Sequence, residues 1–121
     1  MRKSFLMFGL MFILMSGSML FAAQATATWS AVVTNVNGGA ITGVSYNIYR
    51  GPNADGSAAT KLNTTALAAV TYVDTSVGAT TTYYFYVTAV SSTGTEGPKS
   101  TVVRFNASDS VPAAPTNFTV N

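Results

Sequence analysis

The sequence contains no cysteine and no histidine, and charged residues make up only 8% of its 121 residues. Without cysteine the chain has no disulfide, no thiolate metal ligand and no cysteine to carry a lipid after a leader. Without histidine it lacks the side chain most often used as a general base. The carboxylates are expected in separate turns and loops, at Asp55, Asp74, Glu96 and Asp109. We therefore expect no catalytic residue, no metal site and no cofactor.

Two of these acids lie in stretches that could suggest ion binding. Asp74 is expected at the end of a strand, where a carboxylate accepts hydrogen bonds from the backbone amides of a turn. Residues 53–56, NADG, faintly resemble a calcium loop but lack its alternating acids and final glutamate. Both stretches are interpreted as turns.

The long apolar run of the chain is confined to its start. Arg2 and Lys3 precede residues 5–23, FLMFGLMFILMSGSMLFAA, and Ala23-Gln24-Ala25 has the small-x-small form of a cleavage site. This pattern predicts a signal peptide over residues 1–25 and a protein that is secreted, extracellular or at the cell surface. The alternative is a retained membrane anchor, which the glycine and serine interruptions of the run disfavour. No membrane association is expected after cleavage.

Loss of the leader changes the charge of the protein. Two of the six basic residues belong to the leader, so four remain against four acids and the exported chain is neutral. Binding to nucleic acid requires a basic surface that replaces the counterions of the phosphates. No nucleic-acid partner is expected.

After residue 25 no segment shows a sustained helical period. Short runs rich in valine, threonine and tyrosine alternate with turn residues, which is typical of an all-β domain. The predicted strands are 27–33, 44–50, 59–65, 69–76, 81–91 and 100–106, and the loops between them include 35–43, 51–57 and 92–98. The strand over 81–91 presents Tyr83, Phe85 and Val87 on one face and is apolar enough on both faces to be central.

Several of these stretches carry motifs in a fixed order. Trp29 lies in the first predicted strand, and residues 46–50 read YNIYR. Residues 71–100 read TYVDTSVGATTTYYFYVTAVSSTGTEGPKS, and Val77 stands six residues before Tyr83. In this order and spacing the chain resembles a fibronectin type III domain of the bacterial kind. The resemblance covers most of the chain after the leader.

The resemblance implies an immunoglobulin-like β-sandwich of about seven strands. One sheet would hold strands A, B and E, and the other would hold C, C′, F and G. Tyr83 would form a tyrosine corner, in which the phenol oxygen is hydrogen-bonded to the chain near Val77 and fixes the crossover between the sheets. The expected core residues are Trp29, Tyr46, Ile48, Tyr72, Tyr83, Phe85 and Val87.

The chain departs from the family at its first strand. Cleavage after Ala25 leaves only residues 26–28 before Trp29, so the strand A that should precede it is missing. Residues 114–121, APTNFTVN, instead fit the strand A pattern at the opposite end of the sequence. The positions that match are Pro115, Asn117, Phe118 and Val120.

Three explanations of this segment remain open. The chain could be a fragment whose end begins a second domain, or the segment could fold back onto its own domain. It could also complete the sandwich of another copy, as in donor-strand complementation. The last hypothesis predicts a domain over 26–106, a linker and donor strand over 107–121, and an acceptor edge at Ala27, Trp29 and Ala31. The protein would then be a secreted subunit of a pilus-like filament whose partner is itself.

Tyr49, Tyr84 and Tyr86 are expected on the outer face of the second sheet. They could form an added subunit contact, an ordinary cross-strand aromatic cluster or a platform for carbohydrate. The alternative function is therefore a monomeric surface or matrix module that binds carbohydrate or another protein, with a role in adhesion.

Overall fold

The structure is a computed structural model that describes residues 23–121. The predicted leader lies outside the described residues, apart from residues 23–25. Seven strands and one short 3₁₀ helix make up this part of the chain. They are β1 (Ala25–Thr28), β2 (Ser45–Gly51), β3 (Thr60–Lys61), β4 (Thr71–Asp74), β5 (Thr82–Val90), β6 (Glu96–Lys99), β7 (Val103–Asn106) and η1 (Ala107–Ser110). Within residues 23–121 no helix has the length and apolarity to cross a membrane.

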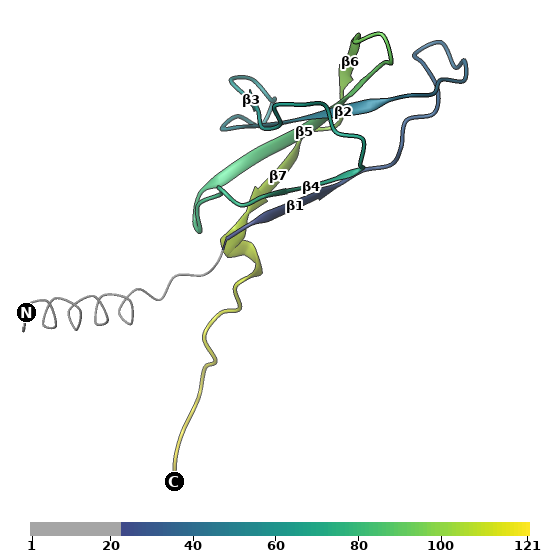
Figure 1. Cartoon of the computed structure of the whole chain (residues 1–121). Helices are drawn as coiled ribbons and strands as arrows, with labels where there is room; N and C mark the ends of the chain where they lie inside the picture. Colours follow the sequence, from purple (N-terminus) through teal and green to yellow (C-terminus); the bar gives the residue numbers. More distant parts are fainter. Residues whose placement is uncertain (1–22) are drawn as a thin grey trace, which may run out of the picture.

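The strands form two antiparallel sheets, as expected for a β-sandwich (Figure 1). The larger sheet has the order β3-β2-β5-β6, and β7 pairs with β5 as well. The smaller sheet consists of β1 and β4. The longest ladder joins β2 and β5, from Ser45 opposite Val90 to Gly51 opposite Tyr84. This ladder holds together the two segments whose alternation was clearest in the sequence.

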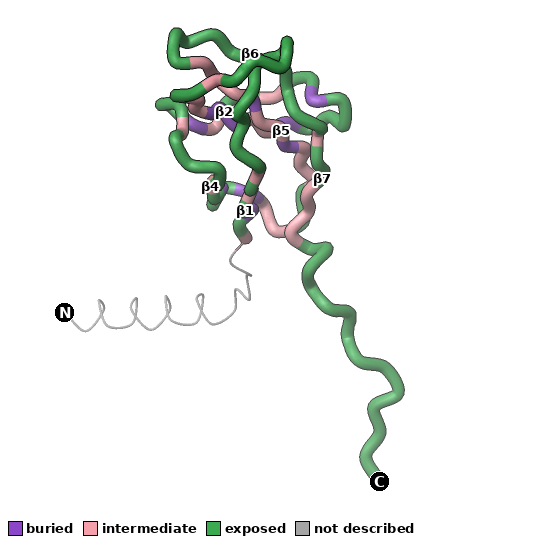
Figure 2. The backbone as a smooth tube through the Cα atoms, turned by 90° about the vertical axis from the view of Figure 1, so that its right-hand side faces the viewer, coloured by how far each residue is buried: buried purple, intermediate pink, exposed green. Residues whose placement is uncertain are grey.

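The core lies between the sheets and is small. Its most buried side chains are Ile48 and Tyr46, which are 1% and 3% exposed. Phe85, Val77 and Ala25 complete it, and Trp29, Tyr72, Tyr83 and Phe105 pack around it half-buried. Figure 2 shows most of the buried stretches in the strands, some in loops, and the C-terminal segment exposed along its whole length. The expected core is therefore largely confirmed, with Ala25 and Val77 as additions and Val87 only half-buried.

The first strand differs from its predicted bounds. It runs over Ala25–Thr28 instead of 27–33. Beyond it the chain forms a hairpin, in which Thr34 pairs with Ala40 and the Ile41 N–H donates to the Val33 carbonyl at 3.0 Å. Val33 and Val36 therefore belong to the hairpin, Val32 directly precedes it, and Ala31 is exposed outside the strand.

The last predicted strand, 100–106, is shorter in the structure, and a further strand precedes it. Residues 92–98 were expected to be a loop, but β6 begins within them at Glu96, and β7 begins only at Val103. Both strands pair with β5, and the ladder between β5 and β6 shifts register between Thr88 and Val90. The 59–65 strand is reduced to Thr60–Lys61, and residues 111–121 form no strand.

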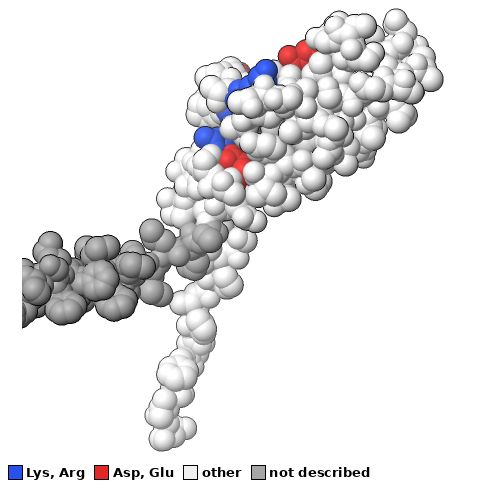
Figure 3. Space-filling view, in the orientation of Figure 1, with Lys and Arg blue, Asp and Glu red and all other residues white. Residues whose placement is uncertain are grey.

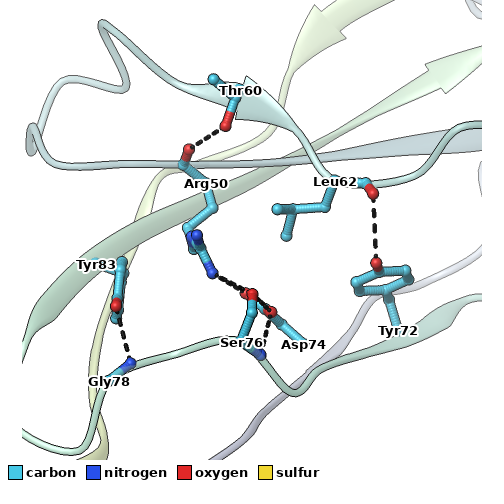
Figure 4. Close-up of polar contacts among 8 residues, drawn as sticks. All are labelled: Arg50, Thr60, Leu62, Tyr72, Asp74, Ser76, Gly78 and Tyr83. Carbon is cyan, nitrogen blue, oxygen red and sulfur yellow. Dashed lines mark hydrogen bonds and ion pairs between the residues drawn. The ribbon is translucent and has the colours of Figure 1, made fainter.

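Polar contacts tie the two sheets together near the crossover from β4 to β5 (Figure 4). The Arg50 guanidinium on β2 lies 2.7 Å from the Asp74 carboxylate at the end of β4. Asp74 also accepts hydrogen bonds from the Ser76 N–H at 3.0 Å and the Ser76 hydroxyl at 2.6 Å, so the predicted turn is confirmed. The Tyr83 hydroxyl accepts a hydrogen bond from the Gly78 N–H at 2.8 Å, next to Val77, as the resemblance implied.

Candidate strand-acceptor groove

Strand β1 has one paired edge and one edge that no strand of residues 23–121 occupies. Its paired edge faces β4, with Ala25 opposite Asp74 and Ala27 opposite Tyr72. The Trp29 N–H continues this register by donating to the Val70 carbonyl at 3.0 Å. Alternate residues of an antiparallel strand direct their N–H and C=O groups to opposite sides. The backbone groups of Thr26 and Thr28 therefore point toward the unpaired edge.

A groove of about 470 Å³ lies between this edge of β1 and strand β7. Its lining is mainly apolar, and Val103 on its β7 side is 60% exposed. Ile48 and Phe85 lie at its base in the core. The remaining lining comes from residues 25–29, 86–87, 100–101 and 104–105. An extended segment placed here could add hydrogen bonds to β1 and bury alternate apolar side chains.

Trp29 lies at the far end of β1 and lines the groove. Its ring packs edge-on against Tyr46, with 5.5 Å between the ring centroids. Its Nε1 atom is buried, and no residue of 23–121 accepts a hydrogen bond from it. Trp29 is the only tryptophan of the sequence, so its fluorescence reports on this region alone.

The expected acceptor residues have different positions relative to the edge. Ala27 is half-buried on the inner face of β1, and the Trp29 amide is already bonded to Val70. Ala31 lies beyond the strand. The backbone groups that could bind a further strand belong to Thr26 and Thr28, which the sequence analysis did not single out. Their role depends on which residues of β4 they face, and no local pattern in the sequence gives that register.

The predicted donor segment is exposed and separate from the groove of its own chain. Phe118 and Val120 are 83% and 82% exposed, and Pro115 is exposed as well. Asn117 has a φ of 59°, in the left-handed region that asparagine tolerates better than most residues. Residue 117 would have to become extended before this segment could act as a strand.

The C-terminal segment leaves the domain at the end where β1 begins. Val111 and Pro112 line a shallow hollow together with Ala23 and Gln24, the residues just before β1. From there β1 runs toward Trp29 and the hairpin of residues 33–41, which lies at the opposite end of the domain (Figure 1). The base of the donor segment and the far end of the groove are therefore at opposite ends of the molecule.

The three tyrosines of the outer face are all half-buried. Tyr49 and Tyr86 are cross-strand neighbours whose rings stack with 4.7 Å between their centroids, and the Lys99 Nζ lies 5.5 Å from the Tyr86 centroid. Tyr84 lies farther along β5, opposite Gly51 and Arg104. The stacked pair covers one face of each ring, as in ordinary cross-strand aromatic pairing. Carbohydrate or protein binding at this face stays a prediction.

The stacked tyrosines are linked to Glu96. The Tyr49 hydroxyl donates to the Glu96 Oε2 at 2.6 Å, and the Thr88 hydroxyl donates to the same oxygen. The hydrogen bond to Glu96 raises the pKa of Tyr49 to about 12. The hydrogen bonds from Thr88 and Tyr49 lower the pKa of Glu96 below its usual value. This cluster keeps its hydrogen bonds within the sheet.

The NADG turn is closed by its own residues. The Asp55 carboxylate accepts hydrogen bonds from the Ser57 hydroxyl at 2.6 Å and the Ser57 N–H at 2.9 Å, and the first of these is the main reason that the pKa of Asp55 is lowered. Among residues 23–121, no three side chains of the histidine, cysteine and carboxylate types come together as metal ligands.

Comparison with known proteins adds no assignment to this geometry. No protein-family model matches the sequence, and no curated protein matches it. The fibronectin type III resemblance therefore stays a prediction, while the antiparallel two-sheet fold stands on the structure.

Proposed function

We propose that this protein is a secreted structural subunit that assembles head-to-tail into an extracellular filament. Residues 114–121 of one copy would add as a strand to the unpaired edge of β1 in the next copy. The observation that carries the proposal is the combination of an apolar groove beside that edge with a donor segment whose Phe118 and Val120 are almost fully exposed. In the fibronectin type III interpretation, the donor segment takes the place of strand A.

The direction of the chain favours addition to another copy. Both sheets are antiparallel throughout, so a strand added to β1 is expected to run antiparallel to it, from the Trp29 end to the Ala25 end. The C-terminal segment of the same chain leaves at the Ala25 end. If it folded back it would run parallel to β1, a rarer arrangement in such sheets. A segment from a neighbouring copy can arrive from the Trp29 end.

A contact of this kind joins two different surfaces of the same molecule. Each copy keeps its own groove and its own donor segment, so the contact can repeat without limit. A donor would enter the groove at the Trp29 end, while the receiving copy's own donor segment leaves at the Ala25 end (Figure 1), so repetition gives an open chain of domains.

The free energy of strand addition is close to balanced. Burial of Phe118 and Val120 contributes about 1.5–3 kcal/mol each. Hydrogen bonds to the N–H and C=O groups of Thr26 and Thr28 contribute about 0.5–1.5 kcal/mol each. Ordering about six donor residues costs about 1–2 kcal/mol each, which is similar to the sum of these gains. The proline at position 115 lowers this cost because it stiffens the segment beforehand.

Substitution of Phe118 by aspartate tests the proposal. The change places a charge on a side chain that the groove must bury, so we expect filaments to disappear while the domain stays folded and is still exported. Thr119→Asp is the matched control, since it adds the same charge at the next position, which faces outward when Phe118 faces inward. The readouts are electron microscopy and sedimentation of the purified chain. Normal filaments from the Phe118→Asp protein would refute strand donation.

A further inference from the structure

The end of the domain at which a neighbour would arrive carries a second apolar hollow. Its volume is about 390 Å³, and it lies beneath the hairpin of residues 33–41. Val32 and Val36 contribute to its lining and are 39% and 82% exposed. Trp29 lines both this hollow and the strand-acceptor groove. The two hollows therefore adjoin at Trp29.

The hairpin that covers this hollow is held by its own hydrogen bonds. The Asn35 side-chain oxygen accepts from the Asn37 N–H and the Gly39 N–H, each at 2.9 Å. The Asn35 N–H donates to the Gly39 carbonyl at 2.8 Å. Gly38 has a φ of 87°, which this tight turn requires and which glycine adopts without strain. The exposed valines are thus presented on a defined turn.

The two segments that would meet, the hairpin of one copy and the C-terminal segment of another, contain no charged side chain. No aspartate, glutamate, lysine or arginine occurs in residues 4–49, and none occurs in residues 110–121. In Figure 3 the C-terminal segment carries no charged side chain. The hollow itself is lined by one charged residue, Lys99, whose Nζ atom donates to the Asp55 carbonyl at 2.8 Å. The linker would bring no second charge to this contact.

We propose that the hollow beneath the hairpin binds Val111 and Pro112 of the neighbouring copy whose donor segment occupies the groove. This inference rests on the proposed function. A donor segment that runs from the Trp29 end of β1 must have its preceding residues at the hairpin end, where the hollow adjoins the groove. Val111 is 40% exposed in the single chain and so is open to such a contact.

This second contact meets a need of the assembly. The free energy gained by inserting the strand is about equal to the conformational entropy cost of ordering it. The translational and rotational entropy lost on association is therefore not offset by the strand alone. Apolar burial of the linker beside the strand adds stabilisation without further ordering of the domain, because the hairpin is already formed. The two sites together would bind residues 111–121 as one continuous segment.

The test uses cysteines, since the sequence has none. In the full chain, Thr26→Cys on β1 and Thr119→Cys in the donor segment report insertion between copies, because both side chains face away from the core and neither is needed to fill the groove. Oxidation is expected to give a ladder of covalent multimers on a non-reducing gel. In this background Val32→Thr with Val36→Thr makes the hollow polar at nearly constant volume. Val73→Thr is the control, because Val73 is 45% exposed on β4 and lines neither hollow.

We expect the Val32→Thr/Val36→Thr protein still to form the ladder on oxidation. Under reducing conditions, however, its filaments should dissociate on dilution at a protein concentration about fivefold or more above that at which the parent's filaments dissociate. Val111→Ser should weaken the filament by a similar factor. Combined with Val32→Thr/Val36→Thr it should have little further effect, because both changes remove the same contact. Dissociation equal to that of the parent and the Val73→Thr control would overturn the inference and leave strand donation standing. Absence of the ladder from the parent would overturn both.

Discussion

Replacement of Asp74 by asparagine should separate the contribution of the ion pair between the sheets from that of the turn. Asp74 is 5% exposed and its Arg50 partner is 21% exposed, with 2.7 Å between the charged atoms (Figure 4). Asparagine keeps a side-chain oxygen that can accept the Ser76 N–H, so the turn is retained. The substitution leaves the Arg50 guanidinium without its counter-charge, 4.7 Å from the Tyr83 ring centroid.

The expected loss is large for a single substitution. Removal of one partner of a buried ion pair costs about 3–5 kcal/mol. Because Arg50 retains some contact with water, we expect a loss of about 3 kcal/mol. With a urea dependence of about 1–3 kcal/mol per molar, the midpoint of unfolding should fall by about 1–3 M. Trp29 fluorescence follows the transition, since this residue packs against the core.

Asp109→Asn provides the matched control. Asp109 pairs with Arg104 at 2.6 Å, but the two side chains are 57% and 51% exposed. An exposed pair contributes about 0–1 kcal/mol, so the midpoint should hardly move. Equal effects of the two substitutions would refute the claim that the Arg50–Asp74 pair stabilises the contact between the sheets.

The pH dependence of the free energy of unfolding provides a second test of the Arg50–Asp74 pair. Burial raises the pKa of Asp74, but the hydrogen bonds from Ser76 and the contact with Arg50 outweigh it and hold the pKa below 3.8 in the folded protein. The pair therefore contributes its full stabilisation above the pKa of the unfolded chain, and this is lost as the pH falls through the folded value. In Asp74→Asn the free energy of unfolding should therefore depend less on pH over this acidic range than in the parent.

Two further substitutions test polar contacts of the larger sheet. Tyr49→Phe removes the hydrogen bond to Glu96 that raises the pKa of Tyr49 from 10.0 to about 12. The stability due to that bond is present below pH 10 and is lost as the pH rises toward 12. The free energy of unfolding in urea should therefore fall less over this range in the variant than in the parent. Asn63→Ala should lower the free energy of unfolding by about 2–3 kcal/mol, because Asn63 is 6% exposed, accepts from the Ile48 N–H at 2.8 Å and donates to Asn47 at 2.9 Å. Urea denaturation measures this loss, with Asn117→Ala as a control at an exposed asparagine. Equal free energies of unfolding for Asn63→Ala and Asn117→Ala would contradict the prediction for Asn63.

The strands with clear alternation could be predicted from the sequence. Tyr46 and Ile48 on β2, and Tyr83 and Phe85 on β5, were expected on the inner face, and all four belong to or pack against the core. A period of two over these segments specifies the face because a shift of one residue would expose every apolar side chain. The hydrogen bond between Gly78 and Tyr83 agrees with the tyrosine corner that the fibronectin type III resemblance implied.

Features that depend on contacts distant in the sequence were not predictable. The valines of residues 32–36 favour a strand locally, but β1 ends at Thr28, and the chain turns into the hairpin instead. Asn47 and Asn63 are polar and were not expected inside, yet their amides satisfy each other and the backbone in a buried position. The Arg50–Asp74 pair joins residues 24 apart in the chain.

The candidate site shows the same limit. A strand A pattern at residues 114–121 could be found from the sequence, because it is a local motif. The backbone groups that could bind it depend on the pairing of β1 with β4, so Thr26 and Thr28 emerged only from the register. The hollow beneath the hairpin required the folded position of Val36 relative to Trp29.

The burial of Ala25 has a consequence for the predicted removal of the leader. The peptide bond after Ala25, where a leader is expected to be removed, lies inside β1, and Ala25 itself is 5% exposed opposite Asp74. Proteases cut segments that are exposed or transiently opened. Once β1 has paired with β4 the bond is protected, so removal of the predicted leader at this bond would have to precede closure of the sandwich. A chain cut there would begin at Thr26, with a charged amino group on β1 itself in place of the buried Ala25, and a chain that folded first would keep Ala25 and its leader.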